Sequence, residues 1–178
     1  KNFWRLWLIV LVIKLGISCL WPLIPDETYY WVWSLFPQLS YFDHPPLTSW
    51  LLKIGHPFLS IGNAVRWPAV LLAHSIFIIW AGIFRHLKLE KLYVAWFWLT
   101  ALSPLLGFGM LLVTPDLPLM VFWSLSIYFF LKSVDHPSFF HSAGLGASLG
   151  MGFLSNFHSL ASSMHLFHLA DSESYSLK

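Results

Sequence analysis

Long apolar stretches separated by short polar ones dominate the chain. A transmembrane helix needs roughly 20 mostly apolar residues, and five stretches approach this requirement. They cover residues 6–24, 64–84, 92–113, 117–134 and 139–161. The pattern therefore predicts an all-α membrane protein with about five transmembrane helices.

The loop between the first two apolar stretches is too apolar for a simple linker. Residues 28–36 are rich in aromatic side chains, and on a helix Asp26, Tyr30 and Trp33 would share one face because of their i, i+4, i+7 spacing. Residues 47–61 are also apolar, but the run is too short to span a bilayer. We therefore expect interfacial helices in this loop.

The basic residues favour one orientation in the membrane. An N-terminus in the cytoplasm places six Lys and Arg residues inside and two outside, which agrees with the positive-inside rule. The inside set is Lys1, Arg5, Arg85, Lys88, Lys91 and Lys132, and the outside set is Lys53 and Arg66. The outer face then carries the acids Asp26, Glu27, Asp43 and Asp116.

Composition supports the membrane class and excludes others. The chain is 57% hydrophobic and 10% charged, with a mean hydropathy of +0.67. Its net charge of +2 and scattered basic residues predict no nucleic-acid partner. A transporter or channel would need ionisable residues deep within several spans, and only Lys14 meets that description clearly. A snorkelling or packed Lys14 is the alternative.

Four groups of residues carry a family resemblance. They are residues 25–31 (PDETYYW), 41–47 (YFDHPPL), 103–105 (SPL) with 114–116 (TPD), and 152–155 (GFLS). In their order and spacing the chain resembles the N-terminal part of GT-C class glycosyltransferases, in the dolichyl-phosphate-mannose protein mannosyltransferase-like family.

The resemblance implies a donor sugar carried on a polyprenyl phosphate. It also implies inverting transfer to an acceptor hydroxyl at the outer, periplasmic face of a bacterial inner membrane. The acceptor is a lipid, a glycan or a protein, and the sequence leaves this open. By the same resemblance Asp26 matches the catalytic base, Glu27 is its acidic neighbour, and Asp116 is another acid at the same cavity.

Further residues are implied at the donor. Asp43 and His44 match the position near the donor phosphate, where related enzymes place an acid and a polar neighbour at a phosphate or divalent-metal site. A divalent metal ion of undetermined identity is therefore a candidate cofactor, with Asp43 and His44 as its ligands. Tyr30 and Arg66 are the other candidates for donor binding.

The residues also allow structural interpretations. Asp26 and Asp116 each precede an apolar run, as helix caps do, and Glu27 beside Asp26 could be merely solvated. Residues 43–44 could form a rigid loop without a metal, and Arg66 could be a snorkelling anchor. A non-catalytic polytopic membrane protein, which binds lipid or a partner through its aromatic loop, is the alternative function.

The chain departs from the family at its end. Asn156 stands where relatives usually have a basic residue, and relatives continue with many further spans. We therefore expect residues 1–161 to be the N-terminal part of a GT-C transmembrane domain in a truncated transferase, and the sequence leaves open whether this form is active. Residues 162–178 are polar and serine-rich, and we expect a non-native or disordered tail there.

Overall fold

The computed structural model describes residues 2–42 and 44–156, which form helices and connecting loops without a β-strand. The long helices are α1 (Asn2–Leu20), α2 (Pro25–Leu35), α3 (Leu47–Gly55), α4 (Trp67–His74), α5 (Ile76–His86), α6 (Glu90–Leu102), α7 (Asp116–Asp135) and α8 (Phe139–Phe153). Short helical turns are η1 (His56–Phe58), η2 (Ala64–Arg66), η3 (Pro104–Phe108) and η4 (Gly109–Leu111). The predicted all-α class is confirmed.

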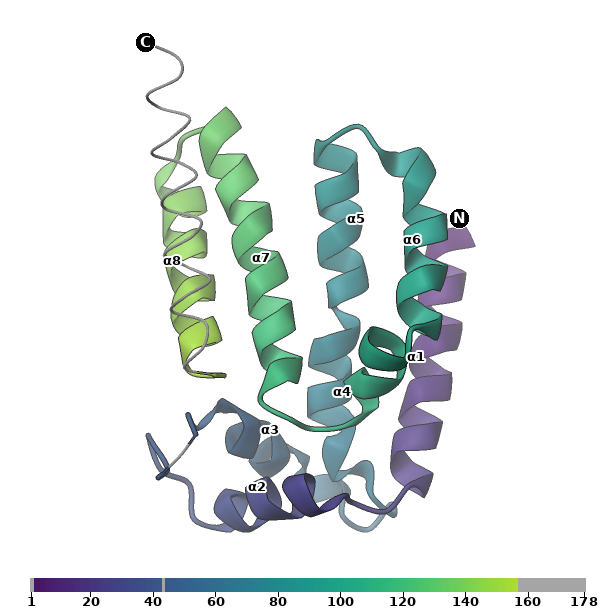
Figure 1. Cartoon of the computed structure of the whole chain (residues 1–178), viewed down its shortest axis with the longest axis vertical. Coiled ribbons are helices and arrows are strands. Elements are labelled where there is room, and N and C mark those ends of the chain that lie inside the picture. The colour runs from purple at the N-terminus through teal and green to yellow at the C-terminus, as the bar shows by residue number, and fades with distance from the viewer. Residues whose placement is uncertain (1, 43, 157–178) are drawn as a thin grey trace.

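Several helices run side by side along the long axis of the molecule (Figure 1). Three segments of the described chain are long and apolar enough to cross a membrane, namely Phe3–Leu20, Ala64–His86 and Asp116–Asp135. The pair of Glu90–Leu102 and Pro104–Leu111 adds a fourth if it counts as one broken span. Of the fifth expected span, α8 covers Phe139–Phe153 and ends there. Residues 157–161, like the expected tail at residues 162–178, lie outside the described part.

The segment expected to span the membrane at residues 92–113 is broken. The chain bends by 70° between α6 and the turns that follow. Ser103 is extended, with φ −65° and ψ 136°, because the residue before a proline is pushed out of the α region. Gly107 then lies so close to Ala101 that an added Cβ would be 2.1 Å from its carbonyl oxygen. Proline and glycine together therefore replace the expected continuous span with a bend.

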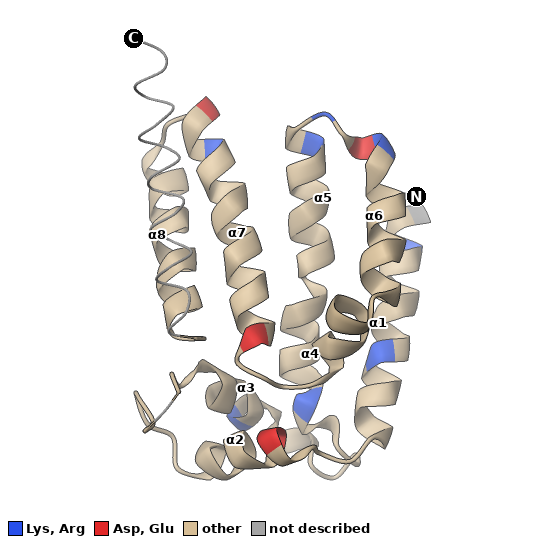
Figure 2. Cartoon of the chain, in the orientation of Figure 1, with Lys and Arg blue, Asp and Glu red and all other residues tan. Residues whose placement is uncertain are grey.

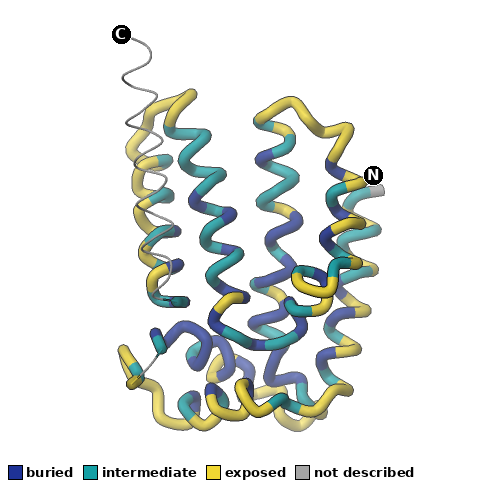
Figure 3. The backbone as a smooth tube through the Cα atoms, viewed as in Figure 1, coloured by how far each residue is buried: buried dark blue, intermediate teal, exposed yellow. Residues whose placement is uncertain are grey.

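Two helices of the first loop lie across one end of the bundle (Figure 1), as expected of interfacial helices. Pro25 opens α2 at a position where its fixed φ suits the first helical turn. Most residues of α3 are buried rather than exposed (Figure 3). The Leu47 N–H donates to the Leu154 carbonyl at 3.1 Å, which joins α3 to the end of α8.

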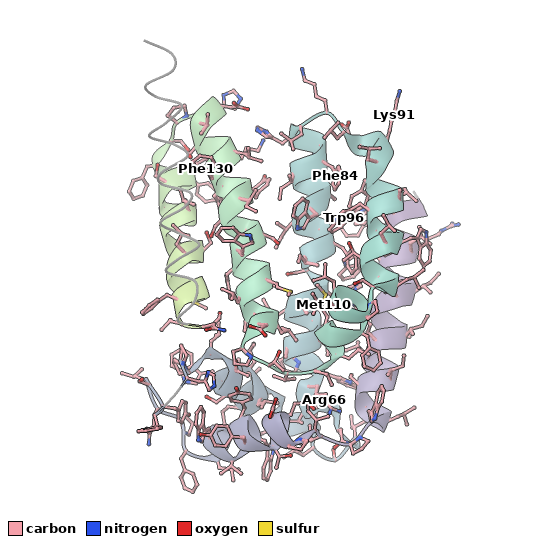
Figure 4. All side chains as sticks on the ribbon, viewed as in Figure 1. Arg66, Phe84, Lys91, Trp96, Met110 and Phe130 are labelled. Carbon is pink, nitrogen blue, oxygen red and sulfur yellow. The ribbon has the colours of Figure 1, made fainter. Side chains whose placement is uncertain are left out.

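Aromatic side chains fill the core between the upright helices. The rings of Phe77 and Phe97 are buried with centroids 4.5 Å apart, and Trp80 stacks on Trp96 at 5.2 Å. Figure 4 shows Trp96 and Phe84 where α5 and α6 meet. Aromatic contacts of this kind stabilise helix packing where lipid supplies no hydrophobic drive.

Apart from Lys14 within α1, most of the described charged residues lie toward the two ends of the bundle (Figure 2). One end carries the turn between α5 and α6 and the last turn of α7, with the charged residues Arg85, Lys88, Glu90, Lys91, Lys132 and Asp135. The other end carries α2, η2 and the first residue of α7, and thus Asp26, Glu27, Arg66 and Asp116. The described acids of the predicted outer loops therefore lie at one end of the molecule.

Candidate active site

A buried ion pair between Glu27 and Arg66 holds this end together. Both side chains are at most 1% exposed. The Arg66 Nε–H donates to Glu27 Oε1 at 2.7 Å, and an Nη2–H donates to Oε2. Figure 4 shows Arg66 beneath the bundle, at the end where α2 and α3 lie.

The remaining donors of Arg66 are also occupied. Nη1 donates to the carbonyls of Ser18 at 3.0 Å and Trp21 at 2.6 Å, and Nη2 donates to that of Pro22 at 2.8 Å. All five N–H groups of the guanidinium therefore have acceptors within the chain. The side chain closes the C-terminal end of α1, whose last carbonyls would otherwise be unpaired.

Glu27 is equally saturated by backbone donors. Oε2 accepts the N–H of Ile24 at 3.0 Å, and Oε1 accepts the N–H of Val113 at 2.8 Å. The first bond is the glutamate half of a capping box, because Ile24 is the N-cap of α2 and Glu27 is its third helical residue. The pair therefore connects α1, α2, η2 and the segment before α7.

This geometry corrects the interpretation of both residues. Sequence reasoning grouped Glu27 with the catalytic acids and Arg66 with the donor-binding residues. The structure buries both and satisfies them internally, so Arg66 has no N–H group left for a phosphate. The alternatives of a solvated Glu27 and a snorkelling Arg66 are wrong for the same reason.

Asp26 differs from the adjacent Glu27 in its exposure and in its contacts. It lies in the first turn of α2, is exposed, and makes no hydrogen bond or ion pair with the described residues. It is not the cap of α2, since Ile24 occupies that position. A carboxylate in the first turn interacts favourably with the helix dipole, and its oxygens stay open to a substrate.

Asp116 is the first residue of α7 and is also exposed. Pro115 occupies the cap position and no side chain caps the helix, so the interpretation of Asp116 as the cap is wrong. Its Oδ1 accepts a hydrogen bond from Asn156 Nδ2 at 3.3 Å. Asn156, which the sequence marked only as a departure from the family, thus orients this acid.

An aromatic cluster forms around His44. The His44 ring lies 5.6 Å from that of Tyr30 and 6.3 Å from that of Trp33, between centroids. Tyr30 is buried, and its ring contacts that of Trp33. Two members of the predicted face of α2 therefore pack together, whereas Asp26 on the same face remains exposed.

Tyr41 is a residue that sequence reasoning assigned no role. Its ring stacks on Trp33 with centroids 4.4 Å apart and an interplanar angle of 3°. Its hydroxyl donates to the Trp33 carbonyl at 3.0 Å and accepts the Gln38 N–H at 3.1 Å. The available signal was a tyrosine four residues before two prolines. Its N–H donates to the His44 carbonyl at 3.3 Å, so Tyr41 also holds the loop that carries His44.

The metal hypothesis gains no support from the described residues. Asp43 lies outside them, so its predicted place at the donor phosphate or a metal stays a prediction. No three His, Cys, Asp or Glu side chains within residues 2–42 and 44–156 lie together as a metal site requires. His44 alone does not define a metal site.

One histidine near the site has a perturbed pKa. Burial, and then the charge of Lys53, lower the pKa of His56 below its ordinary value of 6.5. Its Nε2 lies 2.8 Å from the hydroxyl of Ser34. A neutral ring at this position links α2 to the end of α3 without adding a positive charge near the acids.

Comparison with known proteins supplies the family. The family model described as dolichyl-phosphate-mannose-protein mannosyltransferase matches residues 43–172, which is 130 of the 178 residues. No curated protein and no solved structure matches the chain. His44, Arg66 and Asp116 lie within the matched range, whereas Asp26 precedes it.

The match indicates a glycosyltransferase that takes its sugar from a polyprenyl-phosphate donor in a membrane. It agrees with the apolar helices that the structure contains. It also agrees with the resemblance at residues 103–105, 114–116 and 152–155, which lie within the matched range, whereas residues 25–31 precede it. The chain therefore belongs to the dolichyl-phosphate-mannose-protein mannosyltransferase family.

Proposed function

We propose that the chain transfers a sugar from a polyprenyl-phosphate donor to an acceptor hydroxyl at the end of the bundle that carries α2 and α3. Family membership supports the donor class. The observation that carries the site is the contrast between two adjacent acids. Glu27 is buried and saturated, and it fixes the start of α2, whereas Asp26 is exposed with its oxygens unoccupied by the described residues.

Asp26 is the base in this proposal. Its carboxylate takes the proton of the acceptor hydroxyl while the hydroxyl oxygen bonds to the anomeric carbon of the sugar. The bond from that carbon to the phosphate oxygen breaks, and polyprenyl phosphate leaves with the electron pair. Attack opposite the leaving group inverts the anomeric carbon. A positioned base contributes about 10²- to 10⁴-fold to such a step.

Asp116 and His44 orient the reactants in this proposal. Asp116, held by Asn156, accepts hydrogen bonds from hydroxyls of the sugar or the acceptor. His44 donates to the leaving phosphate, in a position fixed by its contacts with Tyr30 and Trp33. Donors placed where negative charge develops stabilise the transition state. Asp43, next to His44 in the sequence, is proposed for the same phosphate.

The reaction is proposed for the outer face of a bacterial inner membrane. The opposite end of the bundle carries the basic residues Arg85, Lys88, Lys91 and Lys132 as well as the acids Glu90 and Asp135 (Figure 2). Loops rich in Lys and Arg stay in the cytoplasm. The end with Asp26 and Asp116 would then face the periplasm, where the acceptor lipid, glycan or protein meets the donor.

Donor cleavage in proteoliposomes tests the proposal. The full chain is reconstituted with radiolabelled polyprenyl-phosphate mannose, and release of mannose to water or to added acceptor is measured. We expect release above that of protein-free liposomes, and slower release for Asp116→Asn. Release no faster than in protein-free liposomes would support the alternative of a non-catalytic membrane protein that binds lipid.

A further inference from the structure

Lys14 is a buried cation in the membrane-spanning helix α1. Its side chain is 5% exposed, so it does not snorkel to the interface. The Nζ atom lies 3.9 Å from the sulfur of Met110 and 5.4 Å from the centroid of the Phe77 ring. A thioether is a weak acceptor, so the three donors of the ammonium group are poorly satisfied.

No carboxylate within the described residues neutralises this charge. The ion pairs there are Arg66 with Glu27 and His86 with Asp135. Unpaired charges within a membrane are costly and mark sites of function. The contrast with Arg66, which has an acceptor for every donor, indicates that the environment of Lys14 is incomplete.

Lys14 is among the residues that line a cavity of about 310 Å³ between α1, the end of α6 and the broken segment that follows it. The walls are almost entirely apolar, and Ser103 at the bend is the other polar side chain in the lining. Ile17, Trp98 and Phe108 line the cavity and are also exposed on the surface of the bundle. The cavity therefore opens sideways, toward the hydrocarbon of the bilayer.

We propose that this cavity binds the carboxylate of a long-chain fatty acid, with the anion on Lys14 and the hydrocarbon chain along the apolar wall. A carboxylate carries one negative charge and so neutralises one ammonium group. A phosphate monoester carries about −1.5 to −2 at neutral pH, which would leave uncompensated charge at a site with one cation. A phosphodiester carries one charge, but it brings a second, polar substituent, for whose hydroxyl groups the lining offers no polar side chain besides Ser103 and Lys14. The chemistry of the walls and of Lys14 thus matches a single-chain carboxylate.

The site is separate from the proposed transferase site. Lys14 is six residues before the end of α1 at Leu20, which is about 9 Å along a helix axis. Figure 4 shows Met110, its neighbour, between the end that carries Arg66 and the middle of the bundle. A fatty acid anion could reach Lys14 from the membrane leaflet on that side without passing Asp26.

Carbon-13 NMR of bound oleate tests the assignment. The full chain is placed in nanodiscs of phosphatidylcholine, and carboxyl-labelled oleate is titrated in. We expect a bound carboxylate that stays ionised to a lower pH than oleate in empty nanodiscs. Lys14→Met should weaken binding about 30-fold or more, as loss of one partner of a buried charge pair does. Lys14→Arg should retain it.

Matched controls separate the site from general effects. Lys53→Met removes an exposed cation and should not change oleate binding, and neither should Asp26→Asn, so that a failed transferase proposal leaves this result intact. Oleyl alcohol, which lacks the charge, should not displace oleate. Equal binding to Lys14→Met would overturn the proposal, and tighter binding of farnesyl phosphate than of oleate would overturn the choice of a carboxylate.

Discussion

At the scale of single residues, the buried pair of Glu27 and Arg66 is the interaction on which the site depends. Replacing Arg66 by Met leaves the Glu27 carboxylate buried without a counter-charge and frees three carbonyl groups. Breaking a buried pair in this way costs about 3 to 5 kcal/mol. We expect a matching loss in the free energy of unfolding, measured by denaturant titration in detergent micelles.

Two further variants serve as controls for the measurement on Arg66→Met. Lys53→Met removes an exposed cation from the same end of the molecule and should change stability by little. Arg66→Lys keeps the charge but loses the five-donor geometry of the guanidinium, so its loss should be intermediate. Wild-type stability in Arg66→Met would contradict the role of the pair.

His56 allows a prediction about pH. Its pKa is lowered by burial and then by Lys53, so folding favours the neutral ring. The stability that this contributes is present above the ordinary pKa of 6.5 and is lost as the pH falls below it. Lys53→Gln removes the second cause and should raise the pKa of His56, which ring proton shifts in NMR report. An unchanged pKa would mean that Lys53 does not act on the ring.

At the scale of elements, the sequence located the helices well but not their breaks. Apolar length predicted the spans, and the aromatic run predicted α2. In the sequence, the only indication of the bend after α6 is Ser103-Pro104 followed by two glycines. The apolar length of residues 92–113 led instead to the prediction of a continuous span. The effect of a proline on the residue before it can be predicted from a sequence. The close packing of Gly107 against Ala101 cannot be predicted in this way.

Some residues of the candidate site could be predicted from the sequence, and others could not. Motif order indicated Asp26 and Asp116, because acids at the ends of apolar runs are visible in a sequence. The burial of Glu27 was not visible, since its donors come from positions as distant as Arg66 and Val113. Which of two adjacent acids faces inward is decided by tertiary contacts, and periodicity within a short helix does not show them.

Gly107 tests the bend itself. An added Cβ would lie 2.1 Å from the carbonyl oxygen of Ala101, so Gly107→Ala forces the backbone apart. Strain of this kind costs about 1 to 3 kcal/mol. Gly146→Ala is the matched control, because a Cβ there meets nothing within 4 Å and alanine favours the helix by about 0.5 to 1 kcal/mol. Equal thermal midpoints for the two variants would contradict this account of the bend.

At the scale of the whole molecule, the distribution of charge predicts the orientation in the membrane. Cys19 is the only cysteine in the sequence, so a Cys19→Ala background permits labelling at single positions. Leu39→Cys lies in the exposed loop after α2, and Lys91→Cys lies at the opposite end (Figure 4). An impermeant maleimide added to intact cells should label the first variant and not the second. The reverse pattern would place the acids in the cytoplasm.

The two ends of the bundle also differ in what their acids do. Asp135 pairs with His86 at 2.9 Å, and Glu90 lies in the first turn of α6 far along the chain from the proposed site. At the other end Asp26 and Asp116 are exposed at the starts of α2 and α7. A base for sugar transfer is therefore expected at one end only.

The rate of mannose release from polyprenyl-phosphate mannose by Asp26→Asn tests this account most directly. The asparagine keeps the size of the side chain and disturbs no contact, so the folded fraction should equal that of wild type. The rate should fall by about 10²- to 10⁴-fold, while Glu90→Gln at the opposite end keeps the wild-type rate. A wild-type rate in folded Asp26→Asn would contradict the proposed role of this carboxylate as the base.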